Sequence, residues 1–177
     1  MSQERPLILA SASPRRSQLL AGLDVLFTVV PSDVEEPLPE GAVDAVAYAR
    51  ELANAKAREI ACRYPDSVVL AADTVVVLDD RILAKPQDEE EAWSMLRALR
   101  DRGHQVITAV VVAWGQEIRA AHEATGVVMR NYHDDEIADY IRRGEPFDKA
   151  GGYAIQDEAF HPVDHFEGCY CNVVGLP

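Results

Sequence analysis

Basic residues are scarce in this sequence of 177 residues. Its 17 lysines and arginines stand against 30 aspartates and glutamates, which gives a formal net charge of −13. Proteins that coat DNA or RNA neutralise phosphates with a basic face, so this balance argues against a general nucleic-acid-binding role. A small anionic ligand held by a few focused cations is still compatible with it. The hydrophobic fraction of 48% is ordinary for a globular protein.

Long apolar runs and cysteines are also rare. No apolar run approaches the roughly 20 residues of a membrane-spanning helix, and the residues up to Arg16 lack the layout of a signal peptide. Three cysteines are an odd number and too few for a disulfide framework. We therefore expect a protein of the reducing cytoplasm, with neither a membrane nor a nucleic acid as partner.

The spacing of apolar residues predicts alternating strands and helices. Helices are expected over 14–22, 44–64, 88–101 and 134–143, and strands over 6–10, 26–30, 67–78, 81–83, 104–114 and 117–129, with short strands after Tyr153. Gly115 and Gln116 suit a two-residue turn between the two longest strands. Elements in this order predict an α/β protein with a mixed sheet.

Three of the predicted helices begin with capping signals. Asp44 can cap the longest helix, and Asp88 with Glu91 has the pattern of a capping box. Asp134 is expected to cap the helix over 134–143.

The segment SASPRR at 11–16 departs from ordinary helix chemistry. Ser13 and Pro14 form a strong helix start. Arg15 and Arg16 follow at once, although cations at a helix N-terminus oppose the helix dipole. Free amides, serine hydroxyls and two guanidinium groups at one point would bind a multivalent anion such as phosphate. The alternative is that both arginines face solvent or pair with acids.

One carboxylate interrupts the most apolar segment of the chain. Every residue from Val68 to Leu78 is apolar except Asp73 and Thr74, which predicts a strand covered on both faces. An isolated carboxylate in such a strand needs a partner, a metal or a cleft. We favour a functional role for Asp73; the alternative is a strand bend where it makes local hydrogen bonds.

Three further polar residues are candidates for the site. Lys56 falls on the apolar stripe of the long helix, where snorkelling is the alternative to a functional role. Lys149 precedes Gly151 and Gly152, which permit close approach of a ligand to the backbone, and Gln156 can read an amide-like edge. A plain loop with a solvated Asp-Lys pair is the competing interpretation.

Weaker signals come from Lys85, which precedes a proline, and from Glu36, which lies in an acidic, proline-rich loop and can reach a cation. Solvent exposure is the alternative for both. A separate group of residues has side chains that can ligate zinc, although the spacing fits no standard pattern. Its members are His161, His165, Cys169 and Cys171, with Asp164 nearby.

Taken together, the motifs ASASPRR, AADTVVV, LAKP, EPFDKAGGYAIQ and GCYCNVVGLP occur in the order and spacing of the Maf family of nucleotide pyrophosphatases. The chain resembles that family from Leu7 to Pro177. The resemblance implies one domain over residues 1–177, with an elongated mixed sheet flanked by helices and two lobes around a central cleft. It also implies a fold similar to that of the inosine triphosphate pyrophosphatases, a cytoplasmic location and a possible homodimer. The C-terminal helix of the family is expected to be absent here.

The same resemblance implies an activity and roles for single residues. Family members hydrolyse the α-β phosphate bond of nucleoside triphosphates. Arg15, Thr74 and Gln156 are the types found in the branch that acts on dTTP and UTP, although the glycine-rich stretch common after the glutamine is missing. Asp73 matches the catalytic base, and Glu36 and Asp73 match acids associated with Mg²⁺ or Mn²⁺. The remaining substrate-binding positions are those of Ser13, Arg16, Lys56, Lys85 and Lys149.

Two other functions stay open at this point. The chain can be a non-catalytic nucleotide-binding regulator, for example of cell division, or a zinc-stabilised interaction module that uses the histidines and cysteines named above. Release of pyrophosphate from a panel of nucleotides separates the first from an enzyme, and metal analysis tests the second.

Overall fold

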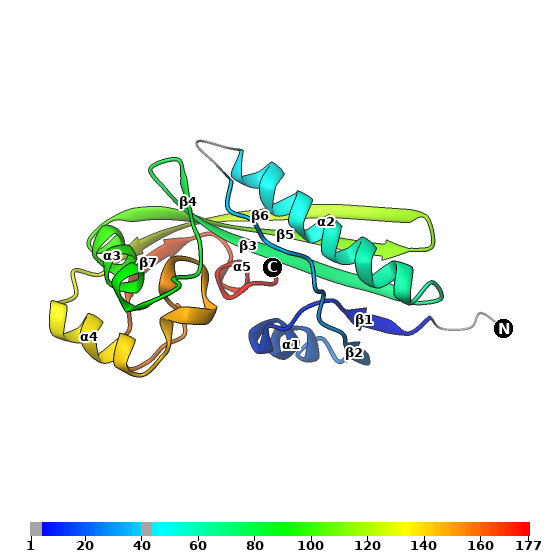
Figure 1. Ribbon diagram of the computed structural model, residues 1–177. Helices are drawn as coiled ribbons and strands as arrows, with labels where there is room; N and C mark the ends of the chain where they lie inside the picture. The colour runs from blue at the N-terminus through cyan, green and yellow to red at the C-terminus, as the bar shows by residue number, and fades with distance from the viewer. Residues whose placement is uncertain (1–4, 40–43) are drawn as a thin grey trace.

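The structure is a computed structural model that describes residues 5–39 and 44–177. Its elements alternate between strands and helices along the chain (Figure 1). They are β1 (Leu7–Leu9), α1 (Pro14–Ala21), β2 (Phe27–Val29), α2 (Ala45–Arg63), β3 (Val68–Leu78), β4 (Arg81–Leu83), α3 (Glu89–Leu99), β5 (Gly103–Trp114), β6 (Glu117–Met129), α4 (Asp134–Arg142), the 3₁₀ turns η1 (Pro146–Asp148) and η2 (Ala150–Gly152), β7 (Val163–Glu167) and α5 (Tyr170–Val174).

The strands of the described ranges form one mixed, seven-stranded sheet. Its order is β2-β1-β3-β5-β6-β7, and β4 pairs separately with β3. β1 runs parallel to β2 and β3, whereas the pairs β3-β5, β5-β6 and β6-β7 are antiparallel. The sequence prediction of an α/β protein with a mixed sheet is therefore confirmed.

The sheet is interrupted along one edge of β3. On that edge, residues 68–70 pair with β1 and residues 76–78 pair with β4. Within the described part of the chain, residues 71–75 have a strand partner only on the opposite edge, where β5 runs along them. The interruption separates a lobe of β1, β2 and α1 from a lobe that contains α3 and α4 (Figure 1). The two lobes and the cleft between them agree with the predicted architecture.

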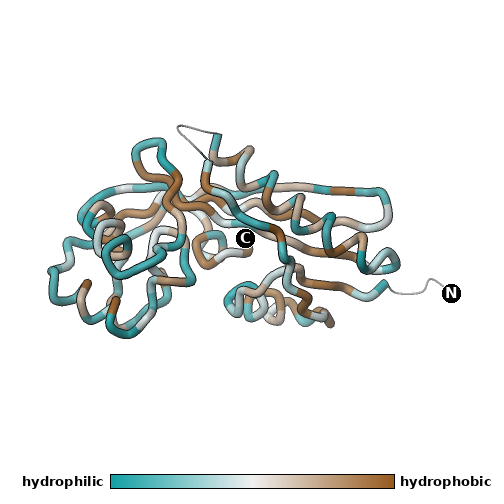
Figure 2. Tube along the Cα trace, in the orientation of Figure 1, coloured by the Kyte–Doolittle hydropathy of each residue, from teal (hydrophilic) through white to brown (hydrophobic). Residues whose placement is uncertain are grey.

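Each face of the sheet is covered by a different set of helices. α2 packs Ala49, Ala53 and Ile60 against one face, which burial of apolar area stabilises. On the other face, α3 and α4 form the larger core with Tyr132 and Tyr140, both fully buried. Figure 2 shows the hydrophobic colours concentrated on the strands. Within the described ranges, no helix is long and apolar enough to cross a membrane.

Helix starts confirm some of the capping predictions and correct one. The Asp44 carboxylate accepts hydrogen bonds from the amides of Val46 and Ala47, as expected for an N-cap. The prediction for the start of α4 is wrong, because His133 is the N-cap there and Asp134 is already helical. The Asp134 carboxylate instead forms ion pairs with Arg97 in α3 and with Arg100, the C-cap of α3.

The start of α3 and the elements after Tyr153 refine the expected pattern. The Asp88 carboxylate accepts from the Glu91 amide, but Glu91 accepts from the Gln87 amide, so the reciprocal bond reaches one residue further out than predicted. After Tyr153 the structure has one short strand, β7, and then the helix α5 in place of further strands. The hairpin turn at Gly115 and Gln116 is confirmed, with φ of 57° at the glycine.

Candidate functional site

A pocket of about 110 Å³ lies where the edge of β3 is open. Both lobes line it, and so does α5 through Val173 and Val174. Every site residue predicted from the sequence lines this one pocket. The residues are Ser13, Arg15, Arg16, Glu36, Lys56, Asp73, Thr74, Lys85, Lys149 and Gln156. The tertiary structure therefore assembles the predicted set, while their individual roles stay predictions.

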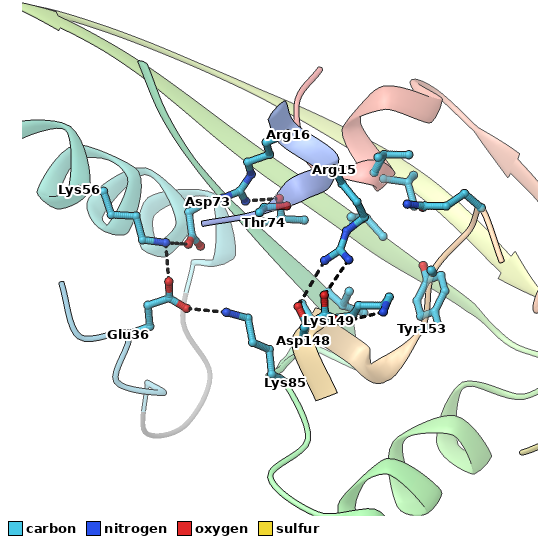
Figure 3. Close-up of a pocket in the computed structure, with 18 residues that line it drawn as sticks. Arg15, Arg16, Glu36, Lys56, Asp73, Thr74, Lys85, Asp148, Lys149 and Tyr153 are labelled. Atoms are coloured by element: carbon cyan, nitrogen blue, oxygen red, sulfur yellow. Dashed lines mark hydrogen bonds and ion pairs between the residues drawn. The ribbon is translucent and has the colours of Figure 1, made fainter. Parts of the chain in front are cut away.

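A buried ammonium group joins the two acids of the pocket (Figure 3). Lys56 Nζ lies 2.6 Å from Asp73 Oδ1 and 2.5 Å from Glu36 Oε1. Lys56 is 7% exposed and Asp73 is 5% exposed, so both are nearly removed from water. The partner of Asp73 is Lys56 on α2. The alternative that Asp73 makes only local hydrogen bonds at a strand bend is therefore wrong. Snorkelling of Lys56 to the surface is likewise ruled out by its burial.

The two carboxyl groups are tuned in opposite directions. Burial raises the pKa of Asp73 above its ordinary value, although the cations of Lys56 and Arg16 oppose this shift. Burial also acts to raise the pKa of Glu36, but hydrogen bonds and charges from Lys56 and Lys85 outweigh it and hold that pKa below the ordinary value. One acid is therefore a stronger base than usual, while its neighbour stays ionised.

The two acids of the pocket have the ligand chemistry of a site for a hard divalent cation. Oxygens of Glu36 and Asp73 both come within 2.6 Å of Lys56 Nζ, so the two carboxylates converge on one small region. Carboxylate oxygens are the ligands that Mg²⁺ and Mn²⁺ prefer. In residues 5–39 and 44–177, no group of three or more His, Cys, Asp or Glu side chains comes together to hold a metal. A metal held by Glu36 and Asp73 would thus need substrate and water oxygens to complete its shell. In the same described ranges, the alternative of a zinc site at His161 and its neighbours gains no support.

Arg16 is fixed by neutral oxygens rather than by acids. Its guanidinium donates to the Gly175 carbonyl at 2.8 Å, to Thr74 Oγ1 at 3.0 Å and to Ser11 Oγ at 3.2 Å. Burial lowers its pKa from the usual 12.5, opposed mainly by the charge of Asp73. Arg16 thereby ties α1, β3 and the residue after α5 together, and it keeps its positive charge beside Asp73.

The start of α1 is only partly as expected. Ser13 is the N-cap and Pro14 the first helical residue, as predicted, but the Ser13 side chain makes no capping hydrogen bond. Ser13 lines the pocket. The first turn of a helix has backbone amides without intrahelical partners, so this position is compatible with the predicted anion site.

A buried chain of hydroxyl and amide groups runs behind Thr74. Thr74 Oγ1 lies 2.9 Å from Thr108 Oγ1, and Thr108 donates to the Asn172 carbonyl at 2.9 Å. The Asn172 amide nitrogen donates to the Val106 carbonyl and to Thr125 Oγ1. These bonds fix α5 against the sheet and so place its two pocket-lining valines. Sequence analysis missed this chain, although Thr108 interrupts an apolar run just as Asp73 does.

Ion pairs cross the mouth of the cleft. Arg15 Nη1 on α1 lies 2.9 Å from Asp148 Oδ2 on η1, and Lys149 Nζ lies 2.6 Å from Asp148 Oδ1 (Figure 3). Lys85 Nζ reaches Glu36 Oε2 at 3.5 Å. The sequence analysis predicted Arg15 and Lys149 as site residues, but it considered Asp148 only as a solvated partner of Lys149. It contains no local signal for a contact between residues 133 positions apart.

The pocket also has apolar lining residues. Val76, Val106 and Tyr153 line it together with Gln156. Tyr153 is itself positioned by a hydrogen bond of 2.6 Å between its hydroxyl and His104 Nε2. Apolar side chains with one amide side chain among them suit a heterocyclic ring that carries amide-like groups.

The model of the family described as Maf-like protein matches residues 6–177. A protein of Thermomicrobium roseum named dTTP/UTP pyrophosphatase is 56% identical over 170 residues, which cover 96% of this chain and 78% of the relative. A Koribacter versatilis protein of the same name is 47% identical and covers 97% of this chain and 88% of its own length. Among solved structures, a nucleoside-triphosphatase / dITP/XTP pyrophosphatase of Mycobacterium abscessus has a TM-score of 0.45 at 16% identity, over 71% of this chain and 75% of its own.

Proposed function

We propose, from the premise that this chain belongs to the Maf-like protein family, that it is a nucleoside triphosphate pyrophosphatase. Its substrates are dTTP, UTP or modified pyrimidine nucleotides, and its products are the monophosphate and pyrophosphate. The two relatives named dTTP/UTP pyrophosphatase, at 56% and 47% identity, support this assignment. The observation that carries it is the position of a buried carboxylate, Asp73, in one pocket with a set of cations.

The proposal places the nucleotide in one orientation. The triphosphate would contact Arg15, Lys85, Lys149 and Ser13, all of which line the pocket. The base would lie beside Gln156 and Tyr153, which line the same pocket. A carboxamide both donates and accepts, which matches the amide-like edge of uracil or thymine.

Asp73 is proposed as the base that activates water for attack on the α-phosphorus. Lys56 occupies its Oδ1 at 2.6 Å, so the proton of the water passes to Oδ2. Because burial raises the pKa of Asp73, its carboxylate accepts a proton more readily than an exposed aspartate. Lys56 holds the carboxylate in place and offsets its charge in an environment that excludes most water.

The rest of the site stabilises charge. Glu36 and Asp73 would hold Mg²⁺ or Mn²⁺, which when bound lowers the pKa of water and offsets the charge of the phosphates. Lys85, Arg15 and Lys149 face the region of the leaving pyrophosphate, where preorganised positive charge is most effective. Arg16 adds a fixed charge beside Asp73 and positions Thr74.

The compartment and assembly belong to the same proposal. We place the enzyme in the cytoplasm, which its unpaired cysteines Cys62, Cys169 and Cys171 support. A homodimer stays a prediction that gel filtration with light scattering would test.

The direct test is a nucleotide panel with Mg²⁺, scored for products by anion-exchange chromatography. Monophosphate with pyrophosphate from UTP or dTTP is the expected result. Diphosphate with orthophosphate would show that a different bond is cleaved. Nucleotide binding without any turnover would instead fit a non-catalytic regulator and would refute the proposed activity.

A further inference from the structure

Asp148 stands between two cations of the pocket and connects the lobes. Its Oδ2 lies 2.9 Å from Arg15 Nη1, and its Oδ1 lies 2.6 Å from Lys149 Nζ. The Asp148 carbonyl also accepts from Arg15 Nη2 at 3.3 Å. One carboxylate therefore holds, at the same time, a guanidinium from α1 and an ammonium from the segment after η1.

The exposure of the three side chains differs in an informative way. The Asp148 side chain is 58% exposed, whereas the Arg15 side chain is 21% exposed and the Lys149 side chain 10%. An ion pair that is open to water on its acidic side adds little to the stability of a fold. Stabilisation of the contact between the lobes therefore explains this arrangement poorly. A better explanation is that Asp148 reduces the net positive charge of the pocket.

Arg16 provides a comparison within the same site. Its guanidinium contacts the Gly175 carbonyl, Thr74 and Ser11, all of them neutral. In the described ranges, no carboxylate lies within 4.0 Å of Arg16. Arg16 consequently keeps its net charge in the cleft. The charges of Arg15 and Lys149 are offset by Asp148, and Lys149 also pairs with Glu145 Oε2 at 3.2 Å. Both acids are partly exposed, so a more highly charged anion can displace them.

We propose that Asp148 is a selectivity residue that competes with bound phosphates for Arg15 and Lys149. This inference rests on the proposed function and concerns the affinity of the same site for its anions. The Asp148 carboxylate competes well for these two cations with an anion of low charge. It competes poorly with a nucleoside triphosphate, whose base makes further contacts in the pocket. Asp148 therefore weakens the retention of pyrophosphate and orthophosphate more than the binding of the nucleotide, and it speeds the clearing of the site after each turnover.

The test measures affinity for inorganic anions in the full chain. Inorganic pyrophosphate and tripolyphosphate are titrated calorimetrically into the wild type and Asp148→Asn. Pyrophosphate is also tested as a product inhibitor of UTP hydrolysis. We expect the Asn variant to bind pyrophosphate roughly threefold to tenfold more tightly, because one negative charge a few ångströms from the ligand is removed. The gain should shrink as salt is raised.

Two further variants control for charge and for folding. Asp139→Asn makes the same change of net charge on α4, where Asp139 pairs with Arg142 at 2.7 Å outside the pocket, and it should leave pyrophosphate affinity unchanged. Asp148→Glu should restore weak binding. A damaged structure would lower affinity, so a gain of affinity identifies competition.

Unchanged or weaker pyrophosphate binding by Asp148→Asn would overturn the inference and leave Asp148 as a bystander or as a support for Arg15. A gain of the same size in Asp139→Asn would also overturn it. The calorimetric comparison requires no turnover. Failure of the wild type to hydrolyse any nucleotide would therefore count against the proposed function alone.

Discussion

Lys56 and Asp73 form a buried ion pair, with 2.6 Å between Nζ and Oδ1, where one edge of β3 has no strand partner among the described residues. An ion pair in such a place is seldom kept for stability alone, because desolvation of both charges offsets much of their attraction. Here the pair also contacts Glu36, which gives the site two acids around one ammonium. Its chemistry and its stability can be tested separately.

Replacement of Asp73 by Asn should abolish turnover while the fold persists. The amide keeps the size of the side chain and an oxygen that can accept from Lys56, but it cannot take a proton from water. We expect the rate to fall by two or more orders of magnitude, with nucleotide binding retained. Rates by pyrophosphate release and affinities by calorimetry check this. Asp79→Asn, which removes a charge outside the pocket near the end of β3, is the control. A near-normal rate would exclude Asp73 as the base.

Replacement of Lys56 by Met should destabilise the protein at neutral pH. The variant leaves the carboxylates of Asp73 and Glu36 near each other without the ammonium between them. Removing one partner of a buried ion pair typically costs about 3–5 kcal/mol. Urea unfolding at pH 7 measures the loss, and the double variant Lys56→Met with Asp73→Asn should regain part of it. An unchanged free energy of unfolding would show that the pair is well solvated in solution.

Stability should fall as the pH drops from 6.5 towards 4. Burial lowers the pKa of His104 from 6.5 to about 4 in the folded protein. The unfolded chain binds the proton at higher pH than the native one, so the stabilisation is complete above pH 6.5 and is lost as pH falls through that window. The shift corresponds to about 3 kcal/mol as an order of magnitude. Urea unfolding at pH 7, 5.5 and 4.5 checks it.

The matched control for this pH effect is His104→Phe. That variant cannot titrate, and its loss of the hydrogen bond to Tyr153 lowers stability by an amount that does not depend on pH in this range. The difference between wild type and variant therefore isolates His104 from the acids that also titrate. Parallel stability curves would contradict the low pKa.

Substitution of Gly151 by Ala should displace Val76, which lines the pocket. Gly151 has φ of 70°, and a Cβ there would meet the Val76 side chain at 3.0–3.2 Å. Gly144 has φ of 75° and open space around the same position. We expect both alanine variants to lose about 1 kcal/mol from backbone strain, and Gly151→Ala to lose more because of the contact. Thermal unfolding of the pair measures the difference. Equal losses would show that Val76 yields without cost.

Much of the fold could be predicted because local patterns determine local structure. Helical spacing and capping residues indicated the four main helices, and the apolar run around Asp73 indicated the central strand. The start of α4 was predicted wrongly because an aspartate and the preceding histidine compete for the same cap position. The competition was decided by Arg97 and Arg100, which pair with Asp134 from another element. α5 was missed since five residues hold too little periodicity to distinguish a helix from a strand.

The sequence by itself determined which residues are candidates for the chemistry, because a lone acid in an apolar strand, a lysine on an apolar stripe and arginines at a helix start each break a local rule. Only the tertiary structure decided how they pair. Lys56 meets two acids, Arg16 meets neutral oxygens, and Arg15 meets Asp148 across the cleft. The physical reason is that electrostatic interaction depends on distance in space and on burial, neither of which is encoded in the spacing of residues along the chain.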